Sequence, residues 1–294
     1  MNWKKFKVKP NKDIKLSKID THAGITRIDT KEFKVQLTKD IEEIAKLQDK
    51  LFAENRQSLL IILQGMDSAG KDGTIKHIMS GVNPQGVMVY SFKHPSTLEL
   101  EHDYLWRHAI KLPEHGQITI FNRSYYENVL ISKVHPKIIL AECIPGIDST
   151  DKIDKGFWSN RYKQINNFEK NIILGGTQVL KFFLHLSKDE QRKRFLERIE
   201  YKEKHWKFSS ADITERKFWN NYQNAYEQAL KHTSTKIAPW YIIPADDKLY
   251  AHQQIGSIIL ETLKKMNPSF PPVDKKEEAL MKEAKIKLGK ENKH

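Results

Sequence analysis

The sequence contains a single cysteine, Cys143, and no apolar run near the roughly 18 residues that a membrane-spanning helix needs. One cysteine excludes a disulfide framework and any cysteine-rich metal site. The first residues carry positive charge without an apolar stretch behind it, which excludes a secretory signal. We therefore expect a cytoplasmic protein that does not associate with membranes.

Acidic residues are too few to balance the basic ones. The 294 residues include 50 Lys and Arg against 37 Asp and Glu, which gives a formal net charge of +13. Such an excess says nothing about the fold, but it fits nucleic acid, an anionic membrane face or a polyanionic small substrate as a partner. The positions of the charged residues have to separate these possibilities.

Between its two ends the chain alternates between helical and strand patterns. Residues 33–54 repeat apolar side chains every three or four positions, which predicts an amphipathic helix. Short apolar segments that predict buried strands lie at 59–63, 87–90, 118–121, 179–186 and 240–244. The alternation predicts a three-layer α/β/α fold with a parallel sheet. We expect one domain over residues 36–270, an extended basic arm at 1–35 and a charged tail at 271–294.

The first predicted strand leads directly into a glycine-rich segment, Gly65-Met66-Asp67-Ser68-Ala69-Gly70-Lys71-Asp72-Gly73, which a helix follows. This segment matches the G-x-x-x-x-G-K part of a phosphate-binding loop in its strand-loop-helix setting. Such loops turn backbone N–H groups inward at a helix N-terminus, and Lys71 would bridge phosphate oxygens. An ordinary glycine-rich turn would not require a lysine at this position. The segment therefore predicts a phosphate site.

Two carboxylates distinguish this loop from the common motif. Asp72 occupies the position where Ser or Thr usually holds Mg²⁺, and Asp67 lies inside the loop. Two anions would repel a phosphate unless a metal ion neutralised them, and Mg²⁺ prefers oxygen ligands. One of these carboxylates could instead orient or deprotonate the attacking group. The alternative for Asp72 is a favourable negative charge in the first turn of a helix.

A second polar cluster follows the strand predicted at 118–121. Asn122 occupies the position at which P-loop folds usually place a metal-binding carboxylate. Arg123 is placed to grip phosphate with its planar guanidinium group, and an ordinary surface arginine is the alternative. Glu127 lies three residues after Ser124, which predicts a capping box, and a capping glutamate can also face the active cleft.

A long basic helix is predicted to begin at the capping box Ser187-Lys188-Asp189-Glu190. On this helix Arg194, Arg198 and Lys202 recur every four residues and should share one face. A solvated face is the usual meaning of such a run. In kinases of this fold, however, the same position carries a mobile lid that closes over phosphates. We expect a helical lid over residues 187–232.

The two-aspartate loop, the segment Asn122-Arg123-Ser124-Tyr125-Tyr126-Glu127 and the pattern Gln191-x-x-Arg194-Phe195 together resemble the family-2 polyphosphate kinases. The resemblance covers residues 30–265, most of the chain. It implies a thymidylate-kinase-like fold and reversible transfer of phosphoryl groups between inorganic polyphosphate and a nucleotide, with Mg²⁺ or Mn²⁺. It also implies a homodimer or homotetramer.

Carried over to this sequence, the resemblance assigns roles to the candidate residues. The implied catalytic residues are Asp67, Lys71, Arg123 and Glu127. The implied phosphate- and polyphosphate-binding residues are Gly70, Lys71, Asp72, Gly73, Arg123, Arg194, Arg198 and Lys202. The implied metal ligands are Asp67, Asp72 and Glu127, the last supplying the carboxylate that Asn122 lacks. Many members have Asp in the place of Asn122. The segment Asn122-Arg123-Ser124-Tyr125-Tyr126-Glu127 therefore resembles the class III subgroup, which phosphorylates both AMP and ADP.

Two other functions remain open at this point. An ATP-dependent kinase of a small nucleoside or nucleotide would use the same fold, although Asp72 and the extended basic helix speak against it. A non-enzymatic nucleic-acid-binding protein would fit the charge and the six tryptophans, but the chain has no helix-turn-helix, zinc or other reader motif. We therefore expect polyphosphate, AMP, ADP and ATP as partners, and no nucleic acid.

Overall fold

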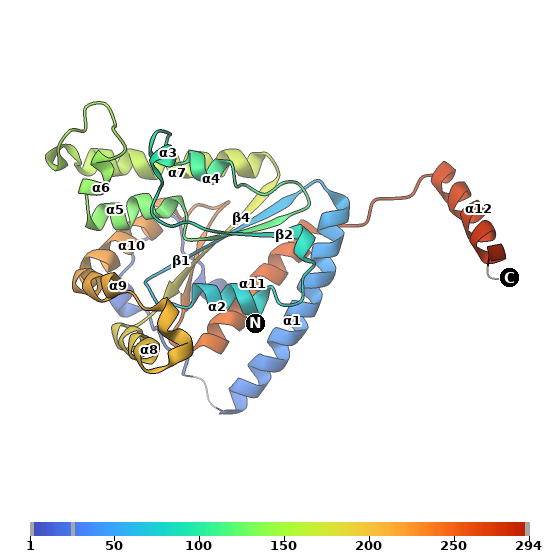
Figure 1. Cartoon of the computed structure of the whole chain (residues 1–294), viewed down its shortest axis with the longest axis horizontal. Coiled ribbons are helices and arrows are strands. Elements are labelled where there is room, and N and C mark those ends of the chain that lie inside the picture. The colour runs from blue at the N-terminus through green and yellow to red at the C-terminus, as the bar shows by residue number, and fades with distance from the viewer. Residues whose placement is uncertain (1–2, 25–26, 292–294) are drawn as a thin grey trace.

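One parallel sheet forms the centre of the computed structural model, which describes residues 3–24 and 27–291. Figure 1 shows the sheet between two layers of helices. The five strands are ordered β2-β3-β1-β4-β5, and each neighbouring pair is parallel. The predicted three-layer α/β/α fold is confirmed.

The strands form where the sequence predicts them. They are β1 (Ser58–Gly65), β2 (Val87–Ser91), β3 (Ile118–Asn122), β4 (Thr177–His185) and β5 (Trp240–Pro244). Every residue of β1 and β5 is buried, as expected of apolar strands that are covered on both faces. Since β1 pairs with β3 on one side and β4 on the other, the loops after these three strands meet at one edge of the sheet.

Alternate side chains of β1 point to opposite faces and build two cores, one under each helical layer. Leu59 and Ile61 pack under α1 (Arg27–Glu54), α2 (Lys71–Ile78) and α11 (Lys248–Met266). This layer fixes the start of α2, and with it the end of the phosphate loop, against the sheet.

The second core lies on the other face of the sheet. Leu60 and Ile62 pack there under α7 (Lys155–Leu174) and α10 (Trp219–Thr233). The other helices outside the chain ends are α3 (Thr97–Leu100), α4 (Trp106–Ala109), α5 (Ile131–Val134), α6 (Lys137–Leu140), α8 (Lys188–Glu200) and α9 (Ser210–Glu215). Single 3₁₀ turns are η3 (Pro84–Gly86), η4 (Tyr125–Val129), η5 (Thr150–Lys152), η6 (Lys202–Lys207) and η7 (Arg216–Phe218).

The N-terminal segment differs from the extended arm that its lysine content predicts. Phe6, Val8 and Leu16 are buried in the two cores, and the Val8 N–H donates to the Trp240 carbonyl at 2.8 Å. An isolated antiparallel bridge to β5 adds to this contact, so the segment covers the edge of that strand. Two short 3₁₀ turns, η1 (Trp3–Phe6) and η2 (Leu16–Lys18), lie within it. Residues 1–2 and 25–26 of the predicted arm lie outside the described residues.

The boundary predicted at residue 35 falls inside a helix. α1 begins at Arg27, before the first apolar residue of the predicted period at Phe33. The first turn, Arg27-Ile28-Asp29-Thr30, contains a single apolar residue, so the apolar repeat that predicts the helix starts only at Phe33.

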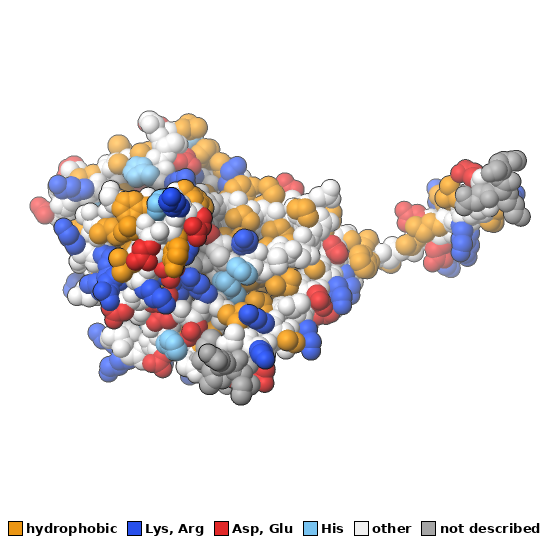
Figure 2. Space-filling model, turned by 60° about the horizontal axis from the view of Figure 1, so that its bottom comes forward, with side chains coloured by type: hydrophobic (Ala, Val, Ile, Leu, Met, Phe, Trp, Pro, Cys, Tyr) orange, Lys and Arg blue, Asp and Glu red, His pale blue; other side chains and the backbone are white. Residues whose placement is uncertain are grey.

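The C-terminal tail carries a helix that stands away from the body. α12 (Lys275–Glu291) follows an extended segment through Pro271 and Pro272, and its residues are exposed throughout. Figures 1 and 2 show α12 separated from the rest of the molecule, and Figure 2 shows basic and acidic side chains interspersed over the visible face of the body. Residues 292–294 of the predicted tail lie outside the described residues. Among the helices that the structure describes, none has both the length and the apolar character to cross a membrane.

Candidate active site at the phosphate loop

The glycine-rich loop connects β1 to α2 with a tight, glycine-dependent path. A Cβ atom at Gly65 would lie 3.0 Å from both the Ala69 Cβ and the Leu184 carbonyl oxygen, so a side chain has no room there. Gly70 adopts a φ of 104°, which L side chains rarely adopt. These two positions explain why the motif requires glycine at both ends of the loop.

Lys71 is folded back over the loop that it follows. Its buried Nζ donates to the carbonyls of Gly65 (2.7 Å) and Met66 (3.3 Å). Within the described residues, no acceptor faces the backbone N–H groups of Lys71, Asp72 and Gly73 at the start of α2. Free N–H groups beside a lysine at a helix N-terminus form an anion-binding cradle.

The charge of Lys71 is sensitive to its surroundings. Burial, and next the nearby Arg123 guanidinium, lower the pKa of Lys71 from 10.5 to about 8. The carboxylates of Asp67, Glu127 and Asp72 act in the opposite direction. The predicted catalytic residues therefore lie close enough to Lys71 to interact electrostatically with it.

Asp67 and Arg123 form an ion pair across the mouth of the loop. The Arg123 Nη2 lies 2.6 Å from the Asp67 Oδ1, and both side chains are partly open to solvent. Arg123 adopts a φ of 63°, and its backbone N–H donates to the Leu63 carbonyl at the end of β1. This left-handed residue turns the chain sharply after β3 and directs the guanidinium group toward the loop.

Glu127 faces the cleft and does not close a capping box. The Ser124 Oγ accepts from the Tyr126 N–H, and the Ser124 N–H donates to the Gln64 side-chain oxygen at 3.1 Å. The Gln64 amide nitrogen in turn donates to the Glu127 Oε1 at 2.9 Å. Burial raises the pKa of Glu127, while Arg123 and Lys71 counteract this rise. The raised pKa brings protonation of this carboxyl group closer to neutral pH than in a solvated glutamate.

Asp72 lies at the first turn of α2, where it has two partners. The Asn122 side chain donates to its Oδ1 at 2.8 Å, and the Lys207 Nζ lies 3.6 Å from its Oδ2. The uncharged Asn122 at the strand end thus orients the carboxylate of the loop. Lys207 belongs to η6, so this contact also joins the predicted lid to the loop.

Arg194 has a different position from the one that the lid prediction gives it. It is buried, and its guanidinium N–H groups donate to the Glu190 carboxylate and to the carbonyls of Ser68, Ala69, Ala245 and Asp246. All five donors of the group are therefore occupied. In this structure Arg194 supports the phosphate loop through the carbonyls of Ser68 and Ala69, and its contact with phosphate stays a prediction.

The predicted basic stripe on one helix is broken after Arg198. α8 ends at Glu200, so Lys202 lies in the 3₁₀ turn η6 and does not continue the helical face. Arg198 remains on α8, where its Nη1 donates to the Lys207 carbonyl (3.1 Å) and to Asp212 (3.0 Å). The rest of the predicted helical lid is likewise divided, into α9, η7 and α10. A four-residue interval between basic side chains does not show where a helix ends, so the sequence alone could not reveal these breaks.

Two cavities meet at Arg123 and Glu127. The first, of about 160 Å³, is bounded by the phosphate loop and the lid segment, and its lining includes Asp67, Asp212 and Tyr226. The second, of about 210 Å³, lies toward α3 and α4. Arg123, Glu127 and Ile131 line both cavities, so a molecule in one would approach a molecule in the other at these side chains.

The second cavity contains residues that no motif in the sequence indicated. Its walls include Phe92, Tyr104, Arg107 and His108. Within the described residues, the buried Tyr104 Oη, Arg107 Nε and His108 Nε2 have no hydrogen-bond partner. Burial lowers the pKa of His108 to about 3, so this side chain is neutral. The three groups come from one short segment between β2 and β3. Its aromatic and basic residues follow no spacing that a known motif would show.

The three predicted metal ligands do not form a closed metal site. In the part of the chain that the structure describes, no three His, Cys, Asp or Glu side chains are placed to hold one ion together. Asp67 and Asp72 are on the loop with partly open carboxylates, whereas Glu127 is bonded to Gln64. Mg²⁺ is commonly held by one or two carboxylates plus substrate phosphates and water, so the loop pair fits this ion and Glu127 fits it less well.

Comparison with known proteins supports the resemblance. The model of the family Polyphosphate kinase 2 (PPK2) matches residues 27–271. An ADP-polyphosphate phosphotransferase of Rhodopseudomonas palustris is 46% identical over 97% of this chain and 98% of its own length. An AMP/ADP-polyphosphate phosphotransferase of Meiothermus ruber is 40% identical over 91% of this chain and 95% of its own length.

A solved structure agrees with these relatives. The crystal structure of polyphosphate kinase 2 from Arthrobacter aurescens TC1 has a TM-score of 0.84 and 36% sequence identity, and the match covers 95% of both chains. The family match spans the sheet, the phosphate loop and both cavities described above. The chain therefore belongs to the Polyphosphate kinase 2 family.

Proposed function

We propose that this protein transfers phosphoryl groups reversibly between inorganic polyphosphate and the nucleotides AMP and ADP, with Mg²⁺ or Mn²⁺. The observation that carries the proposal is the meeting of two cavities at Arg123 and Glu127, one at the phosphate loop and one enclosed by aromatic side chains. The names of the two relatives, one for ADP and one for AMP and ADP, support the substrate class. These names differ in the nucleotide, so activity toward both AMP and ADP, as predicted for class III, is part of the proposal.

The donor phosphate chain would lie on the loop side. Lys71 and the free N–H groups of α2 offer a cradle for the terminal phosphates, and Arg123 can bind the group that is transferred. Arg198 and Lys202 of the lid segment would bind phosphates farther along the chain, with Arg198 exchanging Asp212 for phosphate. Phosphoryl transfer depends mainly on positioning and charge neutralisation, which these groups supply.

The acceptor nucleotide would lie in the second cavity. Aromatic walls and a few unpartnered polar atoms are the features of a pocket that encloses a flat, weakly polar ring such as a nucleobase. A nucleotide held there would direct its phosphate toward Arg123 and Glu127. Glu127, with its raised pKa, is then placed to orient the attacking phosphate or to hold a proton beside it.

The metal requirement rests on the two carboxylates of the loop. Asp67 and Asp72 would hold the ion together with phosphate oxygens, and the buried Ser68 hydroxyl beside them has no partner within the described residues. A bound Mg²⁺ would neutralise negative charge on the phosphates during transfer. The homodimer or homotetramer implied by the family resemblance stays a proposal, which light scattering on the purified protein can test.

The direct test is a reaction without ATP. We expect purified protein with Mg²⁺, polyphosphate and AMP to produce ADP first and ATP later, as followed by chromatography. If ADP yields ATP but AMP yields no product, polyphosphate is still the phosphoryl donor, and the class III assignment is wrong. No product from either acceptor, at low salt and with Mn²⁺ also tried, would favour an ATP-dependent kinase. Competition by polyphosphate but not by DNA would exclude the nucleic-acid-binding alternative.

The lowered pKa of Lys71 predicts a specific pH dependence. Only the protonated amine carries the charge that holds phosphate, so kcat/KM for polyphosphate should fall as the pH rises through about 8. Lys71→Arg should remove this fall because a guanidinium group stays protonated. Since the folded-state pKa lies below the usual 10.5, the lysine destabilises the fold below pH 8 and this penalty disappears as the pH rises toward 10.5. A wild-type profile that stays flat up to pH 9 would contradict the assignment.

A further inference from the structure

A fully buried ion pair lies on the side of the sheet that carries Arg123 and Glu127. Lys181 of β4 and Glu169 of α7 have side chains that are 0% and 2% exposed, and the Lys181 Nζ lies 2.6 Å from the Glu169 Oε2. Two charges in such a place are costly unless every polar atom is bonded. The site described above does not use this pair, so its presence requires another explanation.

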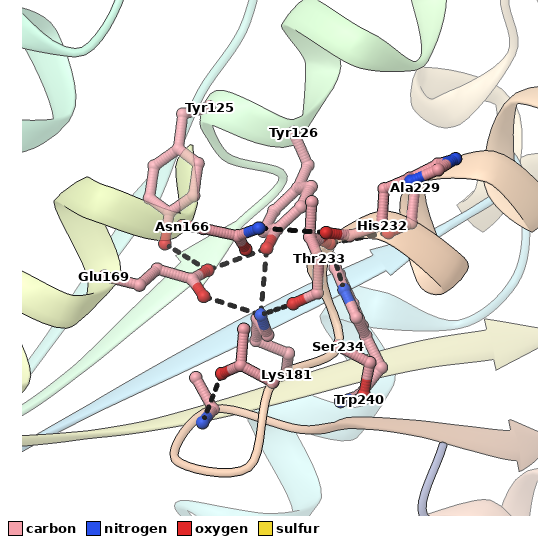
Figure 3. A network of polar contacts seen from close by, with 12 residues as sticks. Tyr125, Tyr126, Asn166, Glu169, Lys181, Ala229, His232, Thr233, Ser234 and Trp240 are labelled. Carbon is pink, nitrogen blue, oxygen red and sulfur yellow. Dashed lines mark hydrogen bonds and ion pairs between the residues drawn. The ribbon is translucent and has the colours of Figure 1, made fainter. Parts of the chain in front are cut away.

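Every donor and acceptor of the pair has a partner. Besides Glu169, the Lys181 Nζ donates to the Tyr126 Oη (3.0 Å) and to the Thr233 carbonyl (2.7 Å). The Glu169 Oε1 accepts from the Tyr125 Oη (3.0 Å) and the Tyr126 Oη (2.7 Å). Figure 3 shows these bonds converging on Lys181 and Glu169 from the turn η4 and from α10.

The two tyrosines belong to the turn that presents the catalytic side chains. Tyr125 and Tyr126 lie between Arg123 and Glu127 in the sequence, and both are completely buried. The turn is a single 3₁₀ segment that begins after a left-handed Arg123, a conformation that most residues avoid. Local backbone preferences therefore cannot hold Arg123 and Glu127 in place, whereas two hydroxyls fixed to one carboxylate can.

The same lysine also fixes the lid side of the cavity. Thr233, whose carbonyl accepts from Lys181, is the last residue of α10. Tyr222 and Tyr226 of this helix line the cavity at the phosphate loop. The buried pair thus connects both walls of that cavity to the sheet.

We propose that Glu169 and Lys181 are positioning residues for phosphoryl transfer, acting on Arg123 and Glu127 through the hydroxyls of Tyr125 and Tyr126. The inference rests on the proposed function, because the assay is the transfer reaction. A purely stabilising pair would change the melting temperature without changing the geometry of the transition state. A positioning pair controls kcat, since a small displacement of a charged group at the reacting phosphate lowers the rate steeply.

The test compares two deletions of a buried hydroxyl, one inside the network and one outside it. Tyr125→Phe removes one bond to Glu169 and leaves the ring in place, and we expect kcat to fall about tenfold with both KM values within about twofold. Thr177→Val is the matched control: it removes a buried hydroxyl bond, 2.9 Å between Thr177 Oγ1 and Ser58 Oγ, at the start of β4 and outside both cavities. We expect a lower melting temperature and an unchanged kcat for this variant. Tyr126→Phe provides a second deletion if Tyr125→Phe does not fold.

A double-mutant cycle with Arg123→Lys identifies the route of the effect. If Tyr125 acts through Arg123, the tenfold loss should shrink clearly when Arg123 is already replaced. Equal losses in both backgrounds, or equal kcat values for Tyr125→Phe and Thr177→Val, would overturn the inference. Failure of the wild type to use polyphosphate would instead refute the proposed function, so the two failures are distinguishable.

Discussion

Replacement of Lys71 by alanine should lower kcat for transfer from polyphosphate to AMP or ADP by roughly a thousandfold. The lysine amine is the one cation inside the loop itself, and the backbone cradle alone cannot neutralise the transferring phosphates. The variant should stay folded, because the deletion removes a charge that burial already disfavours. Initial rates by coupled detection of ADP and ATP, together with thermal melting, measure both quantities.

The matched control for Lys71 is Lys76, which follows it by five residues on α2. Lys76 is exposed and lies in the last turn of α2, outside the loop, so Lys76→Ala should leave kcat within about twofold of the wild type. Near-normal turnover by Lys71→Ala would place the active site elsewhere. An equal loss in both variants would mean that α2 as a whole, and not one amine, had been disturbed.

The parts of the site that could be predicted from the sequence are those in which neighbours in sequence are neighbours in space. The phosphate loop is contiguous, and its strand, glycines and lysine follow one another in a fixed order, so the sequence alone brings Lys71 and Asp67 together as candidates. Arg123 and Glu127 were found because they follow a strand end, and parallel strands bring such ends to one edge. The five strands were predictable for a similar reason, since burial on both faces requires continuous apolar runs.

The remaining parts depend on where distant segments pack. Arg194 has the spacing of a lid residue, but only the fold shows that four backbone carbonyls surround its guanidinium group. Lys181 lies between apolar residues in the middle of β4, and nothing in the sequence indicates that Glu169 lies opposite it. The N-terminal segment was predicted to be an extended arm because it is rich in lysine. Its packing is determined instead by Phe6 and Val8, which are buried against the body of the protein.

The second large effect is expected at Asp67, whose replacement by asparagine should lower kcat about a hundredfold to a thousandfold. The change preserves size but removes the charge that pairs with Arg123 and that fits a metal ion. Both partners are partly exposed, so the loss of this ion pair should cost at most about 1 kcal/mol of folding free energy. A large loss of activity with a small change in melting temperature is therefore the expected combination.

Asp72→Asn on the same loop separates the two roles of these carboxylates. Asp72 is more exposed than Asp67 and is bonded to Asn122 and Lys207, not to Arg123. If the loop carboxylates act only as metal ligands, raising Mn²⁺ should restore much of the activity of both variants. If Asp67 also holds Arg123 against the transferring phosphate, Mn²⁺ should restore Asp72→Asn but not Asp67→Asn. Near-normal kcat for Asp67→Asn at ordinary Mg²⁺ would contradict both roles, because the ion pair with Arg123 would then serve neither metal binding nor catalysis.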